Sequence, residues 1–139
     1  MGVIYDYFAA DSDEQAAAAL DLPGGPGGPD GHDGPVVSCR IDPAVRLGEL
    51  ARLFAGVDRS SGAPIAATPD FDQLVLPISP DLRAALAAAT PAELDAVAEP
   101  WSRIEEFDGG FAPPDAAEFL HSLAEVSRAG KGLYCWICI

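Results

Sequence analysis

The segment at residues 133–139, LYCWICI, is the feature that most constrains the fold. Side chains alternate between the two faces of a β-strand, and here both alternating sets are apolar. Leu133, Cys135 and Ile137 share one face, whereas Tyr134 and Trp136 share the other. A strand that is apolar on both faces is typical of the centre of a sheet covered on two sides. We therefore expect this segment to be a central strand.

The rest of the chain alternates between strand and helix patterns. Further strands are predicted at residues 2–8, 36–41 and 73–78, and Pro77 should place the last of these at an edge or end it. Residues 57–70 show no periodicity and are predicted to be a loop. The expected helices begin near Asp13, Pro43, Pro80, Pro91 and Pro114, several of them after capping residues. Pro100 should kink the fourth helix, which we expect to continue through residues 101–107.

This order predicts an α/β or α+β fold, with a single small sheet of about four strands packed with four to five helices and the C-terminal strand central. A length of 139 residues fits one domain, residues 1–139. Residues 23–35 contain six glycines and four prolines. We predict that they form a flexible loop.

The charge is strongly unbalanced. Twenty-two acidic residues oppose eight basic ones, which gives a formal net charge of −14. Binding to nucleic acid or to an anionic membrane needs clustered Lys and Arg, so both are disfavoured. A basic protein partner is the electrostatically favoured alternative. The charge also has a simpler explanation, which is solubility or adaptation to salt.

The N-terminus lacks a basic segment followed by a long apolar run, and no stretch approaches the length of a membrane span. With three cysteines, an odd number, the sequence indicates a reducing compartment, and we expect a cytoplasmic protein. Residues 135–138 match a CxxC pattern. Side chains three apart on a strand face opposite ways, so we predict that these thiols are buried filler and not a redox or metal site.

Two other patterns could carry metal chemistry. Glu118 and His121 form a single Glu-x-x-His match, whereas di-iron bundles use two such pairs. We interpret them as part of a solvated helix face that also carries Glu125 and Arg128. Residues 30–33, DGHD, hold ligand residue types within the Gly/Pro loop, where ordering would cost entropy. We therefore expect no metal site, no cofactor and no catalytic residue.

The most suggestive segment for a ligand site is 101–107, because it combines aromatic, cationic and carboxylate groups. Asp6 shares a strand face with Ile4 and Phe8, so its carboxylate would need a partner if that face is buried, and Arg103 is one candidate. The ligand-binding hypothesis therefore concerns six residues: Asp6, Trp101, Arg103, Glu105, Glu106 and Trp136. The alternative is that Trp101 and Phe107 anchor a kinked helix in the core, with Arg103 paired to Glu106 or Glu99.

Three segments carry a resemblance: residues 1–8 (MGVIYDYF), residues 100–107 (PWSRIEEF) and residues 133–138 (LYCWIC). Together they resemble a family of small uncharacterised actinobacterial proteins. The two termini are also distantly similar to the YfbM-like family, a domain of unknown function. The resemblance implies an α/β fold and no particular activity.

Two functional hypotheses follow. The first is a non-enzymatic protein-binding or regulatory module, in its sharper form an inhibitor or immunity-type protein that masks a basic partner. The alternative is a small enzyme or ligand-binding protein with a pocket around Asp6, Arg103, Glu105 and Glu106. A closed cavity lined by these groups would support the alternative, and solvent-exposed Arg103 and Glu105 side chains would argue against it.

Overall fold

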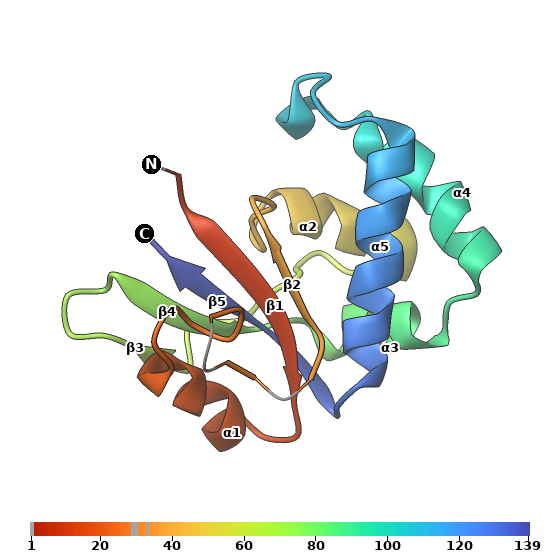
Figure 1. Ribbon diagram of the computed structural model, residues 1–139. Coiled ribbons are helices and arrows are strands. Elements are labelled where there is room, and N and C mark those ends of the chain that lie inside the picture. The colour runs from red at the N-terminus through yellow and green to blue at the C-terminus, as the bar shows by residue number, and fades with distance from the viewer. Residues whose placement is uncertain (1, 29–30, 33) are drawn as a thin grey trace.

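The computed structural model describes residues 2–28, 31–32 and 34–139. Within these ranges the chain forms one antiparallel sheet in the order β2-β1-β5-β4-β3 (Figure 1). Its strands are β1 (Ile4–Ala10), β2 (Val36–Cys39), β3 (Ala66–Ala67), β4 (Gln73–Pro77) and β5 (Gly132–Cys138). The C-terminal strand β5 lies in the centre, between β1 and β4. The predicted fold class and the central position of this strand are confirmed.

Four helices lie on the first side of the sheet (Figure 1). They are α2 (Arg46–Leu50), which continues as a π-helical segment Ala51–Ala55, then α3 (Pro80–Ala88), α4 (Pro91–Ser102) and α5 (Pro113–Arg128), with α4 packed on the outer side of α5. Leu133, Cys135 and Ile137 of β5 pack against them in the larger core. Helix α5 buries the apolar stripe that its sequence predicts, with Leu120 and Leu123 at 0% exposure.

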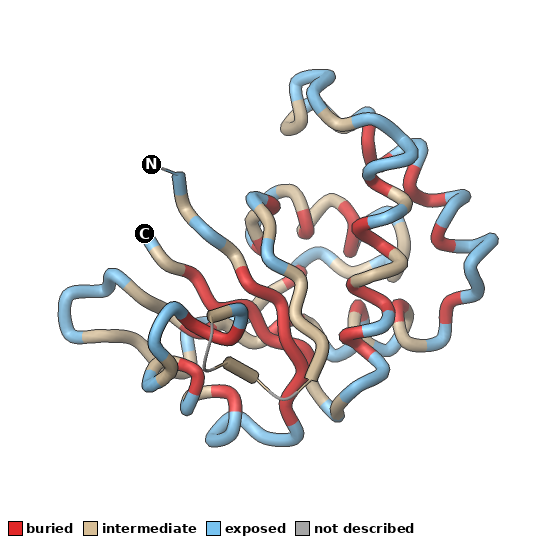
Figure 2. The backbone as a smooth tube through the Cα atoms, viewed as in Figure 1, coloured by how far each residue is buried: buried red, intermediate tan, exposed pale blue. Residues whose placement is uncertain are grey.

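The second face is covered by α1 (Asp13–Ala17) and the 3₁₀ turn Ala18–Asp21. Tyr134 and Trp136 of β5 pack there with Phe8. Both faces of β5 are therefore buried, as the sequence predicts, and Figure 2 shows this burial running along β1 and β5. Ser12 caps α1, because its Oγ accepts a hydrogen bond from the backbone N–H of Gln15 at 3.1 Å.

Two expectations differ from the structure. The predicted loop at residues 57–70 contains β3, which pairs with Val75 and Leu74 of β4, so the sheet has five strands and not about four. The helix expected to continue through residues 101–107 ends at Ser102, and only Glu105–Phe107 form a 3₁₀ turn. Pro77 does end β4, as predicted.

Candidate functional site

The six residues of the ligand-binding hypothesis lie in three different places. Trp101 is 0% exposed in the larger core, where its ring stacks on Phe119 at 5.7 Å between centroids. The side chain of Arg103 is 70% exposed and pairs with Glu99 at 2.9 Å. Glu105 is exposed. The six side chains therefore do not converge on one site within the described part of the chain, and the exposed Arg103 and Glu105 side chains argue against the ligand-pocket alternative.

Asp6 and Trp136 form the third group, on the second face of the sheet. They are directly opposed in the β1–β5 register. Asp6 is 2% exposed; its Oδ2 accepts a hydrogen bond from the backbone N–H of Gly27 at 3.0 Å, and its Oδ1 has no partner among the described residues. Asp6 is therefore buried and takes a backbone partner, so its pairing with Arg103 is wrong.

The described part of the Gly/Pro-rich loop packs over this pair. Gly25 and Pro26 are buried, and Gly25 sits directly against the ring of Trp136. His32 meets the ring of Phe8 edge-on at 5.4 Å. Asp30 and Asp33 of the DGHD segment lie outside the described residues, and the flexibility of the loop stays a prediction.

The cysteine and histidine patterns are separated by the fold. Cys135 packs in the larger core and Cys138 on the opposite face, so the CxxC sulfurs point away from each other. Burial raises the pKa of the Cys135 thiol well above its ordinary value. His121 contacts Asp95 of α4 at 2.8 Å instead of completing a site with Glu118. Among the described residues no cluster of three or more His, Cys, Asp or Glu side chains is arranged to hold a metal ion.

The structure instead brings together a groove that the sequence analysis missed. It has a volume of about 520 Å³ and lies between the edge strand β2 and helix α5. One wall consists of residues 37–41, and the other includes Asp115, Glu118 and Phe119 of α5. Phe107 and Phe111, from the segment before α5, close one end and pack on each other at 4.7 Å.

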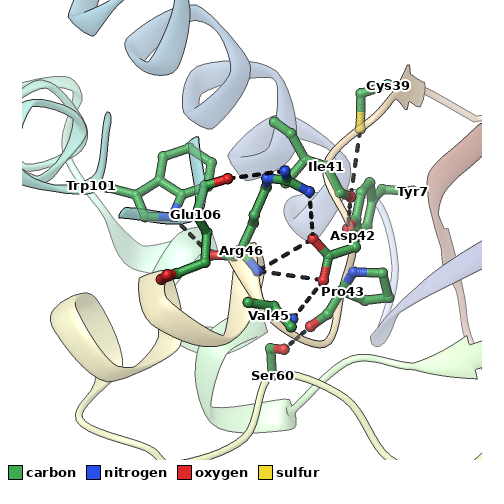
Figure 3. Close-up of polar contacts among 10 residues, drawn as sticks. All are labelled: Tyr7, Cys39, Ile41, Asp42, Pro43, Val45, Arg46, Ser60, Trp101 and Glu106. Atoms are coloured by element: carbon green, nitrogen blue, oxygen red, sulfur yellow. Dashed lines mark hydrogen bonds and ion pairs between the residues drawn. The ribbon is translucent and has the colours of Figure 1, made fainter. Parts of the chain in front are cut away.

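Arg46 fixes this end of the groove (Figure 3). Its guanidinium contacts Asp42 Oδ1 at 3.1 Å, donates to the carbonyl of Glu106 at 3.0 Å and lies 5.6 Å from the centre of the Phe107 ring. The indole N–H of Trp101 donates to the carbonyl of Arg46 at 2.9 Å. These contacts hold residues 42–46 and 105–107 together although the two segments are about sixty positions apart. Contacts between such distant segments leave no pattern in the sequence. Only the Asp42–Arg46 pair, four residues apart, could have been predicted.

The floor of the groove is held from β1. The hydroxyl of Tyr7 donates to the carbonyl of Ile41 at 2.6 Å. Burial raises the pKa of the neighbouring Cys39 thiol to about 11. This thiol is therefore neutral near pH 7, and a neutral thiol is a poor nucleophile. The groove is better suited to binding than to covalent chemistry.

Comparison of the chain with family models, curated proteins and solved structures finds no significant match. Within the described ranges, no helix is both long enough and apolar enough to cross a bilayer.

Proposed function

We propose that this protein is a cytoplasmic, non-enzymatic binding module that docks a basic protein partner on its acidic surface, in the manner of an inhibitor or immunity-type protein. The main observation behind the proposal is that most of the basic side chains form ion pairs or hydrogen bonds within the molecule. Five of the eight are engaged within the molecule, namely Arg46, Arg52, Arg83, Arg103 and Arg128.

Arg83 and Arg128 illustrate the effect. Each guanidinium donates to two backbone carbonyls, those of Ser127 and Gly130 for Arg83 and those of Ala87 and Ala89 for Arg128. These bonds satisfy carbonyl groups at the ends of helices and leave both guanidinium groups without a carboxylate partner among the described residues. Acidic residues outnumber basic ones by 22 to 8, and only Asp42, Glu49, Glu99 and Asp95 pair with a basic side chain within the described part of the chain. The surface therefore presents a field that attracts positive charge.

Affinity capture from the native host, with the intact chain immobilised, tests this function. Captured proteins should be basic. Their yield should fall steeply as NaCl is raised from ~0.01 M to ~1 M, because the Debye length then falls from about 30 Å to about 3 Å. Retention of acidic or neutral proteins, or a yield that salt does not change, would contradict the proposal.

A further inference from the structure

We propose that the groove between β2 and α5 receives an extended, positively charged segment of the partner protein, which pairs with β2 as an additional strand of the sheet. This inference rests on the proposed function and specifies how the partner binds. Strand addition to an open sheet edge supplies affinity through main-chain hydrogen bonds, and neighbouring pockets supply side-chain specificity.

The first support is the difference between the two edges of the sheet. Edge strands carry unpaired N–H and C=O groups and are usually short, charged or interrupted by proline. The β3 edge has two residues and is bracketed by Pro64 and Pro69. In contrast, β2 is twice as long, with four residues between Pro35 and Arg40, and within the described ranges it pairs with β1 alone. Only the β2 edge adjoins the groove.

The second support is the direction of the side chains. Val37 and Cys39 of β2 face the larger core and line the groove. Side chains directly opposite one another on paired strands share a face. Two alternating side chains of an added segment would therefore enter the groove beside Val37 and Cys39, where the rings of Phe107 and Phe111 offer an apolar contact.

The third support is charge. Asp115 and Glu118 are exposed on the α5 wall, and neither forms an ion pair with the described residues. Arg46 is already held by Asp42, and the remaining cation of the groove, Arg40, lies on the opposite wall. A Lys or Arg of the segment, next to the apolar side chain that enters the groove, would complement the two carboxylates.

The test uses a library of random ten-residue peptides displayed on phage and selected against the intact protein. Enriched peptides should combine alternating apolar residues with Lys or Arg, and amide NMR should show shifts concentrated in residues 36–40 and 115–122. N-methylation of alternate peptide amides in the pairing register should weaken binding at least tenfold. This modification removes main-chain donors and leaves the side chains and the charge unchanged.

Two matched variants localise the effect. Glu118→Lys and Glu125→Lys make the same charge change on the same face of α5, two turns apart, but only Glu118 lines the groove. We expect Glu118→Lys to weaken peptide binding about tenfold, and Glu125→Lys to weaken it less than twofold. Circular dichroism would verify that both variants fold.

The outcomes separate the two proposals. Failure to enrich any peptide, binding that tolerates N-methylation, or equal effects of the two variants would overturn strand addition. If captured host proteins were still basic and released by salt, the acidic-surface function would survive. Peptides enriched without any basic residue would contradict the positively charged segment proposed for the groove, whereas the acidic-surface function is decided by the capture experiment.

Discussion

At the scale of single residues, Gly25 combines a left-handed backbone with a close contact to an aromatic ring. Its φ is +74°, and a Cβ there would lie 2.6 Å from ring atoms of Trp136. A left-handed conformation costs a non-glycine residue about 1–2 kcal/mol, and overpacking adds about 1–3 kcal/mol. We predict that Gly25→Ala lowers the free energy of unfolding by about 2–4 kcal/mol, measured by urea denaturation.

Gly109 provides the matched control for this substitution. Its φ is +70°, but nothing lies within 4 Å of the position that a Cβ would take. Gly109→Ala should therefore lose only the conformational contribution, about 1–2 kcal/mol. Equal losses for the two variants would show that the loop does not pack on Trp136.

Ionisation of Cys39, which lines the groove, should make the stability of the fold depend on pH in the alkaline range. Its pKa is raised from 9.0 to about 11 by burial, so the native state favours the neutral thiol. This contribution to stability is complete below pH 9 and is lost as pH rises toward 11. A shift of this size corresponds to about 3 kcal/mol.

We predict that Cys39→Ala, which cannot ionise, is less stable than the parent protein near pH 8 and that this deficit shrinks as pH approaches 11. Urea midpoints measured under reducing conditions across this range would check it. A deficit that stays constant with pH would show that Cys39 ionises equally well in the folded chain.

The environment of Asp6 could be predicted from the sequence only in part. The alternation in β1 places Asp6 on the same face as Phe8, and the structure shows both of these side chains buried. Its partner is the backbone N–H of Gly27, which any residue except proline could supply, so no side-chain pattern points to it. Arg103 is a natural candidate by charge, but a long charged side chain gains more from solvent and from Glu99 one helical turn away.

At the scale of elements, helices and strands are predicted correctly where neighbouring residues alone determine the structure. The Thr90–Glu93 capping box starts α4, and β5 is central because both of its faces are apolar. By comparison, β3 has only two residues and exists through its pairing with β4, so it leaves no periodic signal. The groove was not predicted because β2 and α5, although each was expected, are brought together only by the tertiary fold.

The capping box yields the prediction at this scale. Thr90 Oγ1 accepts from the N–H of Glu93 at 3.2 Å, and the Glu93 carboxylate accepts from the N–H of Thr90 at 3.0 Å. Thr90→Ala removes the first bond and should lower the free energy of unfolding by about 1 kcal/mol. Thr90→Ser keeps the hydroxyl and should change stability much less. Equal denaturation midpoints for the two variants would contradict a stabilising role for this cap.

At the scale of the whole molecule, the net charge of −14 should dominate the response to salt. Self-repulsion destabilises a compact state of high net charge, whereas the few ion pairs, mostly exposed like Arg103–Glu99, contribute little. Screening should therefore stabilise the fold. We predict that the thermal midpoint rises as NaCl increases from ~0.01 M to ~1 M, over which the Debye length falls from about 30 Å to about 3 Å.

Glu125→Lys tests the cause of this salt effect. It changes the net charge by +2, from −14 to −12, at an exposed position without an ion pair among the described residues. Less repulsion remains for salt to screen, so the rise in thermal midpoint should be smaller than in the parent protein. A midpoint that falls with added NaCl would mean that attractive pairs outweigh the repulsion, and the unneutralised carboxylates would then lose their place in the proposed binding surface.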